Sequence, residues 1–223
     1  MRFFLTAVVM IGLPLVGFGQ LCGHSYESRI VEIHTQASLL PGLKERLVMV
    51  GSSTIRKWPA VDSVFSEYEV VNAGFGGSCF EDLWVLRESL IYRLQPDVLL
   101  IYEGDNDLHD RVPESRILAT AEALLVDLAS RLPHCRVVLV AAKPSPARYH
   151  LHREYLSLND KLRSTALSNG AFWVDFWMVQ HDQTGGLRLD LFDRDQLHLN
   201  PLGYRVWAQE LSRQQPWIRP GEF

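Results

Sequence analysis

Short apolar runs that alternate with helical segments constrain the fold of this chain more than any other feature. Residues 97–102 contain four consecutive apolar residues, Val-Leu-Leu-Ile, which is typical of a strand buried on both faces of a parallel sheet. Four other short apolar runs are also predicted to be strands. The five expected strands are Arg46–Val50, Tyr68–Asn72, Asp97–Tyr102, Arg136–Ala142 and Ala171–Phe176.

Helical periodicity marks the segments around these runs. Within residues 114–132, for example, Ile117, Ala121 and Leu124 lie on one stripe, which is the spacing of an amphipathic helix. Strands and helices that alternate at these lengths predict one α/β domain with a five-stranded parallel sheet. The expected helices are Tyr26–Leu40, Glu81–Leu94, Glu114–Leu132, Arg153–Leu167 and Pro201–Gln214.

The composition narrows the class of protein. The chain has 223 residues, 47% hydrophobic and 22% charged, with a net charge of −4, which is ordinary for a soluble globular domain. There is no basic block or stripe, so we expect no nucleic-acid partner. The oligomeric state stays open.

The N-terminus has the pattern of a secretory signal peptide. A basic start at Met1-Arg2 precedes an apolar run over residues 3–16, and Gly17 and Gly19 supply small residues at −3 and −1. We expect cleavage after Gly19, a secreted or periplasmic protein, and no stable membrane insertion afterwards. An uncleaved anchor and a lipid-bearing Cys22 are alternatives, but the apolar run is short for a bilayer span. The expected parts are residues 1–19 as signal peptide, 20–44 as a helical segment packing on the domain, 45–214 as the main domain, and 215–223 as a poorly ordered tail.

Four polar fragments follow predicted strands. They are Gly51-Ser52-Ser53, Asn72 to Gly77, Gly104 to Asp107, and Asp195 to His198. The carboxyl ends of parallel strands lie along one edge of the sheet, where ligands bind, so we expect these fragments to meet there.

Three of these fragments offer a nucleophile and hydrogen-bond donors. Ser53 lies at a strand-to-helix turn, which exposes its hydroxyl and the nearby backbone N–H groups. Gly77 lets its N–H approach a substrate oxygen, and Asn106 supplies an uncharged amide donor. Taken singly, Ser53 also fits a helix N-cap, Gly77 a tight turn and Asn106 an Asx-turn. Asp107 is expected to hold its loop together.

The fourth fragment, Asp195-x-x-His198, is the most specific. Its spacing lets the carboxylate bond the Nδ1 atom of the imidazole and leaves Nε2 to accept a serine proton. The alternative is a pair of metal ligands completed by His150 and His152, but the sequence has no His-Glu-x-x-His motif. We expect neither a metal nor an organic cofactor.

Together the fragments resemble the SGNH hydrolase (GDSL esterase/lipase) family. The likeness runs from about Arg46 to Trp207 and is carried by Val-Gly-Ser-Ser-Thr-Ile-Arg, Asn-Ala-Gly-Phe-Gly-Gly-Ser, Tyr-Glu-Gly-Asp-Asn-Asp-Leu and Asp-Gln-Leu-His-Leu-Asn-Pro-Leu-Gly-Tyr. Lys143-Pro144-Ser145-Pro146-Ala147-Arg148 is similar to a subgroup of secreted members. The resemblance implies a flavodoxin-like three-layer α/β/α sandwich with strand order 2-1-3-4-5, and a serine esterase acting on a small-molecule ester. The roles it implies are Ser53 as nucleophile, Ser53, Gly77 and Asn106 as oxyanion donors, His198 as base and Asp195 as its orienter.

Several residues depart from the family pattern or stay ambiguous. Ser52 fills the Asp position of Gly-Asp-Ser, so Ser52 remains an alternative nucleophile. Glu103 stands where a small or apolar residue is expected and, if it faced the site, would disfavour anionic substrates. Cys79 is expected to be a core or helix-start thiol with no disulfide to Cys135. Arg148 either binds the polar part of the substrate or ties a loop.

The substrate is the least constrained feature. A secreted, acidic protein favours short acyl esters such as acetyl groups on carbohydrate. Lysophospholipase or thioesterase activity is the alternative, with a longer chain received by aromatic residues. A non-catalytic carbohydrate- or lipid-binding protein of the same fold is the alternative of another class. The aromatic residues in question are Trp58, Phe75, Phe80 and Trp84.

Overall fold

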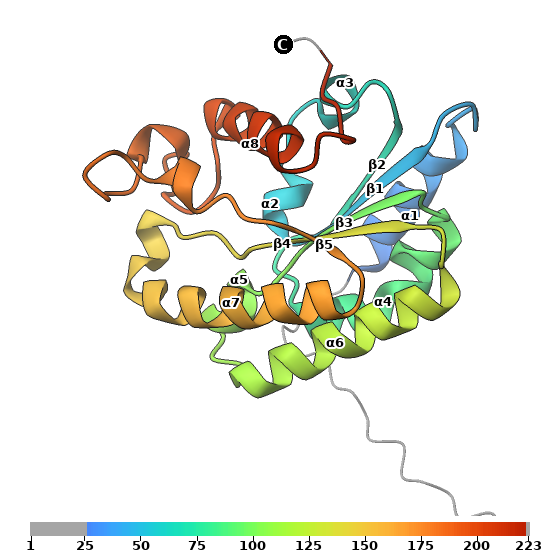
Figure 1. The fold of residues 1–223 in the computed structure, drawn as a ribbon. Coiled ribbons are helices and arrows are strands. Elements are labelled where there is room, and N and C mark those ends of the chain that lie inside the picture. Colours follow the sequence, from blue (N-terminus) through green and yellow to red (C-terminus); the bar gives the residue numbers. More distant parts are fainter. Residues whose placement is uncertain (1–25, 222–223) are drawn as a thin grey trace, which may run out of the picture.

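A computed structural model describes residues 26–221 of the chain, and its five strands form a single parallel sheet (Figure 1). The strand order is β2-β1-β3-β4-β5, which confirms the predicted α/β fold and topology. Strand β1 lies between β2 and β3, since Leu47 is paired with both Val70 of β2 and Val98 of β3. The strands are β1 (Arg46–Gly51), β2 (Glu69–Gly74), β3 (Val98–Tyr102), β4 (Arg136–Val140) and β5 (Phe172–Val174).

Helices cover both faces of the sheet, and the alternation of side chains along each strand decides what each face buries. In β1, Val48 and Val50 point into one apolar cluster, whereas Leu47 and Met49 point into the other. The first cluster lies under α1 (Glu27–Ser38), α4 (Phe80–Leu90), α6 (Glu114–Arg131) and α7 (His152–Ser168). The second lies under α2 (Ser53–Arg56), α3 (Val61–Val64) and α8 (Pro201–Gln214). The result is a three-layer α/β/α sandwich.

The helix bounds agree with the sequence prediction except after α4. The predicted helix over 81–94 breaks at Ile91, whose backbone (φ −127°, ψ −66°) is not helical, and continues as the short 3-10 helix η1 (Tyr92–Leu94). The other helices of residues 26–221 are three further 3-10 helices and the short α-helix α5. They are α5 (Asp105–His109), η2 (Pro146–Leu151), η3 (Met178–Gln180) and η4 (Leu189–Leu191).

The expectation of a poorly ordered C-terminal tail is wrong for the residues that the structure describes. Ile218 is fully buried, the carbonyl of Trp217 accepts a hydrogen bond from the Tyr68 hydroxyl at 2.8 Å, and the Gly221 N–H donates to Val64 O at 2.6 Å. An isoleucine and a tryptophan in this stretch supply apolar surface that packs on the second cluster. Residues 222–223 lie outside the described range.

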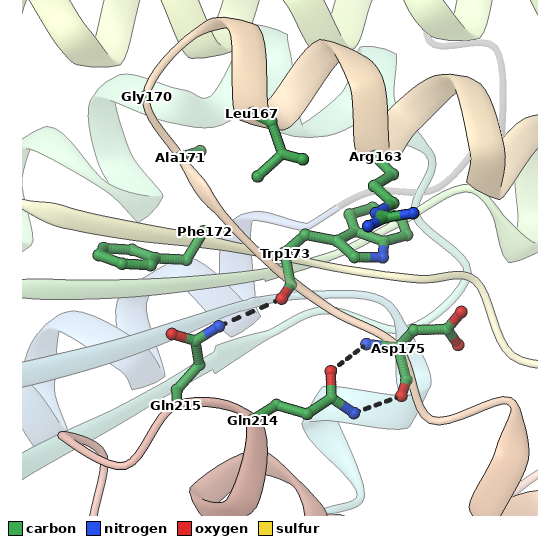
Figure 2. A pocket seen from close by; sticks show the side chains of 9 residues that line it. All are labelled: Arg163, Leu167, Gly170, Ala171, Phe172, Trp173, Asp175, Gln214 and Gln215. Atoms are coloured by element: carbon green, nitrogen blue, oxygen red, sulfur yellow. Dashed lines mark hydrogen bonds between the residues drawn. The ribbon is translucent and has the colours of Figure 1, made fainter.

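Two glutamines at the end of α8 occupy the open edge of β5, beside a pocket (Figure 2). The Gln214 side chain accepts from Asp175 N at 3.0 Å and donates to Asp175 O at 2.6 Å, while Gln215 donates to Trp173 O at 3.2 Å. These amides imitate the hydrogen bonds of a neighbouring strand and so close an edge that could otherwise pair with another chain.

The N-terminal segment docks on the domain through α1. Arg29 donates to Gly74 O and Asn72 O at 2.9 and 2.8 Å, and Ile33 is fully buried. The expected signal peptide, residues 1–19, and Cys22 lie outside the described residues. Over residues 26–221 no helix is both long and apolar enough to span a bilayer, and neither Cys79 nor Cys135 forms a disulfide there.

Candidate active site

Ser53 begins α2 immediately after β1 ends. Gly51 makes this turn possible, because it has φ +138° and a Cβ there would lie 2.1 Å from Tyr102 O. Ser52 is 1% exposed, and its N–H donates to Tyr102 O at 3.3 Å. Ser53 is only partly buried, so of the two serines it is Ser53 that presents its hydroxyl to the carboxyl edge of the sheet.

His198 lies against that hydroxyl. Its Nε2 atom is 2.8 Å from Ser53 Oγ, and its Nδ1 atom is 2.6 Å from Asp195 Oδ2. The other oxygen of Asp195 accepts the backbone N–H groups of Leu197 and His198 at 3.0 and 2.9 Å. Partial burial raises the pKa of Asp195, but these hydrogen bonds outweigh it and hold the pKa far below its ordinary value. The carboxylate is therefore charged whenever the imidazole accepts a proton.

The glycine loop after β2 lies next to Ser53. A Cβ on Gly76 would be 3.8 Å from the Ser53 Cβ atom. Gly77 has φ +81°, a left-handed backbone that favours glycine. Within the described part of the chain, neither the Ser53 N–H nor the Gly77 N–H donates to another protein group. Both are available to a substrate oxygen.

Asn106 is held in one orientation by its neighbours. Its Nδ2 atom donates to Ser78 O at 2.8 Å, and its Oδ1 atom accepts from Nη1 and Nη2 of Arg148, each at 3.1 Å. A guanidinium only donates, so the atom that faces it must be the amide oxygen. The amide nitrogen thus points to the Gly77–Ser78 loop with one N–H still to give.

The structure therefore brings together the five residues that the sequence singled out. A carboxylate, an imidazole and a hydroxyl in a hydrogen-bonded line are able to generate a nucleophile. The glycine loop beside Ser53 and the Asn106 amide that bonds this loop carry N–H donors of the kind that stabilise an anion on an attacked carbonyl. The five residues are Ser53, Gly77, Asn106, Asp195 and His198.

A family of known proteins matches most of the chain. The model of the GDSL-like Lipase/Acylhydrolase family matches residues 48–206. The chain belongs to that family. It is an enzyme that hydrolyses ester bonds. No curated protein is significantly similar in sequence.

Solved structures share the fold of this acylhydrolase. A GDSL-like lipase from Bacteroides thetaiotaomicron is 18% identical with a TM-score of 0.69, over 83% of this chain and 96% of that one. An acetylxylan esterase from Geobacillus stearothermophilus is 16% identical with a TM-score of 0.64, over 78% and 96%. A Bacteroides fragilis protein assigned as an acylhydrolase is 20% identical with a TM-score of 0.72, over 88% and 100%.

Two buried acidic residues of the acylhydrolase accept hydrogen bonds from the loops that carry Gly77 and Asn106. Asp107 accepts from Phe80 N at 3.1 Å and Gly104 N at 3.0 Å, as expected of a residue that holds its loop, and burial raises its pKa to about 7. Glu103 is 1% exposed and accepts from the Ser78 hydroxyl at 2.6 Å. Burial and the nearby Asp107 raise the pKa of Glu103 well above its usual range. Glu103 thus lies beneath the loop and does not present a charge to the substrate.

Arg148 pairs with Asp105 at 2.6 Å and bonds Asn106, so of the two roles expected for Arg148 the structure supports the salt bridge that ties a loop. One contact was not foreseen from the sequence. Lys57 places its ammonium 3.0 Å from His198 Nδ1 and 3.7 Å from Asp195 Oδ2. Its position one helical turn after Ser53 is the signal that could have revealed it.

Cys79 is the buried N-cap residue that precedes α4, which confirms the expected helix-start thiol. Among residues 26–221, no group of three or more His, Cys, Asp or Glu side chains is arranged to share a metal ion.

Proposed function

We propose that this acylhydrolase is a serine esterase that works through an acyl-enzyme on Ser53. The observation that carries the proposal is the continuous hydrogen-bonded line from Asp195 through His198 to Ser53, with distances of 2.6 and 2.8 Å. An imidazole placed in this way accepts the hydroxyl proton as the oxygen attacks, and the carboxylate stabilises the imidazolium that forms.

The proposed reaction has two similar halves. Ser53 Oγ attacks the ester carbonyl, and the developing oxyanion accepts hydrogen bonds from the N–H groups of Ser53 and Gly77 and from Asn106 Nδ2. The imidazolium of His198 then gives its proton to the departing alcohol. Water enters, loses a proton to His198, and releases the acid from Ser53 by the same steps.

We infer that the acyl group is short. The aromatic residues that could have received a long acyl chain pack against the protein's own side chains. Phe75 and Phe80 are 0% and 1% exposed, and Trp58 is 4% exposed. The Trp84 ring is covered by the Arg87 guanidinium at 3.7 Å. An acetylxylan esterase among the structural neighbours also supports an acetyl group. Its catalytic mutants replace a serine or an aspartate by alanine, the residue types proposed here for nucleophile and orienter.

For the alcohol, we propose an apolar groove of about 420 Å³ between η2 and the segment that includes Leu187 and Leu189. The groove adjoins the histidine loop, because Ala147 N donates to Gln196 O at 3.0 Å. His198 must protonate the alcohol oxygen, so the alcohol has to leave on this side. The Tyr149 ring, 45% exposed on the groove, stacks one face on His152 with ring centroids 5.2 Å apart, and we propose that a sugar stacks on its other face.

The test is turnover of p-nitrophenyl acetate, butyrate and octanoate, acetylated xylan and lysophosphatidylcholine by the wild type and by Ser53→Ala, with Ser52→Ala as the matched control. We expect preference for acetate and loss of activity only in Ser53→Ala. Preference for octanoate or lysophosphatidylcholine would favour the lipid hydrolase. A protein that neither turns over esters nor reacts with a fluorophosphonate would favour the carbohydrate- or lipid-binding alternative.

We also propose that the enzyme is secreted or periplasmic, on the basis of the N-terminal pattern over residues 1–19. N-terminal sequencing of the protein from its native host is expected to begin near Gln20. An intact Met1 would reject the proposal.

A further inference from the structure

Three charged side chains are buried between the Asn106 side of the site and the loop that carries His198. Asp105 opens α5, Lys143 follows β4, and Arg148 lies in η2. The side chain of Lys143 is 0% exposed, and those of Asp105 and Arg148 are 5% and 10% exposed. Charges are costly to bury, so a cluster with two cations and one anion needs a reason to exist.

Asp105 is the centre of this cluster. Its Oδ1 atom accepts from Arg148 Nη1 at 2.6 Å and from the Tyr155 hydroxyl at 2.5 Å, and its Oδ2 atom is 3.6 Å from Lys143 Nζ. Burial alone would raise the pKa of Asp105, but the Lys143 and Arg148 cations bring it below the ordinary value. The carboxylate is thus a fixed negative charge beside both basic side chains. Burial lowers the pKa of Lys143, and the Asp105 carboxylate opposes that shift.

Each cation extends to a different half of the site. Arg148 bonds the Asn106 side-chain oxygen and so aims the amide that faces the glycine loop. Lys143 Nζ donates to the carbonyl of Leu197 at 2.7 Å. Leu197 immediately precedes His198, and its own N–H binds Asp195 Oδ1. One carboxylate therefore connects the oxyanion side of the site with the loop that carries the imidazole.

We propose that Lys143 is a positioning residue that sets the place of the Asp195–His198 loop relative to Ser53. The proposal rests on the roles of Ser53 and His198 given under Proposed function. Lys143 touches neither of them. It acts through the Leu197 carbonyl on one side and through Asp105 on the other. An apolar side chain of the same length would fill the same space but leave that carbonyl without its donor.

Loss of this contact has a specific kinetic signature. A displacement of about 1 Å at a reacting group can lower the rate by about a hundredfold. Protonation of the leaving group by His198 matters more for an alkoxide than for p-nitrophenolate, which leaves readily without it. A displaced imidazole therefore slows ethyl acetate more than p-nitrophenyl acetate, whereas a general loss of folded protein slows both equally.

The experiment compares Lys143→Met, Lys143→Arg and Val140→Ala with the wild type. Val140 is buried in β4 and lies outside the polar cluster, so Val140→Ala controls for lower stability. For Lys143→Met we expect kcat/KM for p-nitrophenyl acetate, which reports the acylation step, to fall by about a hundredfold, and kcat/KM for ethyl acetate to fall further. Lys143→Arg keeps the cation and is expected to recover part of the loss. The downfield proton resonance of the His198–Asp195 hydrogen bond is expected to shift or broaden in Lys143→Met only.

Wild-type kcat/KM in Lys143→Met, or equal losses of kcat/KM for both esters, would overturn the proposal. If Lys143→Met does not fold, Lys143→Gln replaces it, since its polar side chain is shorter than that of lysine and leaves the Asp105–Arg148 pair in place. The same kinetic pattern is then expected, and its absence overturns the proposal. Failure of the serine-esterase mechanism itself is recognised separately, because the wild type would then not react with a fluorophosphonate at Ser53.

Discussion

Replacement of Asn106 by Asp tests the hydrogen bond proposed between Asn106 and the transition state. The variant keeps the shape of the side chain and an oxygen for Arg148, which contacts Oδ1 twice at 3.1 Å. It removes both amide N–H groups, the one that bonds Ser78 O and the one proposed to bond the oxyanion, and it brings a negative charge to the proposed oxyanion site.

Loss of one such donor costs about 3 kcal/mol of transition-state stabilisation, or about two to three orders of magnitude in kcat. Repulsion between the new carboxylate and the oxyanion adds to this loss. KM is expected to change little, since the donor acts on a charge that the ground-state ester does not have. The assay is steady-state hydrolysis of p-nitrophenyl acetate, with circular dichroism to verify the fold and Asn106→Ala for comparison. An Asn106→Asp enzyme with more than about a third of wild-type kcat would refute this role of Asn106.

Three further expectations concern stability and specificity. Burial and Asp107 raise the pKa of Glu103, so the stability contributed by the neutral Glu103 is present below about pH 4 and is lost as the pH rises through the folded-state pKa. In urea unfolding, Glu103→Gln should therefore gain stability over the wild type between about pH 5 and 8. A stability difference between the two proteins that does not change with pH would contradict this. Ile218→Ala should lose about 2–5 kcal/mol in the same assay because the residue is fully buried, whereas Met178→Ala, at 80% exposure, should lose little; equal losses would contradict the packed tail. Tyr149→Ala should raise KM for acetylated xylan but not for p-nitrophenyl acetate, and equal effects would remove the groove from the alcohol site.

The sheet could be predicted because its determinants are local. The apolar run in β3 and the helical stripe in α6 report burial within a few residues of sequence, and Pro201 at the first turn of α8 marks where that helix begins. The end of α4 at Leu90 was missed because the break depends on the backbone of Ile91, which no periodicity reveals.

In the site, too, contacts between residues close in sequence could be predicted, whereas contacts between distant residues could not. The Asp195–His198 pair spans three residues, so its geometry could be anticipated from spacing alone. The contact of Lys143 with Leu197 spans 54 residues and exists only because the fold brings the end of β4 to the histidine loop. The burial of Phe75 and Phe80 likewise depends on helices that pack over them, which is why they could be mistaken for an acyl-binding surface.

The most direct test is where the acyl group is attached during turnover. The enzyme is mixed rapidly with p-nitrophenyl acetate, quenched in acid within the first turnovers, digested and mapped by mass spectrometry. Acetate on the peptide with Ser53, formed in step with a burst of p-nitrophenolate and missing in Ser53→Ala, is the predicted result. Acetate on Ser52 or Cys79, or a burst that survives in Ser53→Ala, would contradict it.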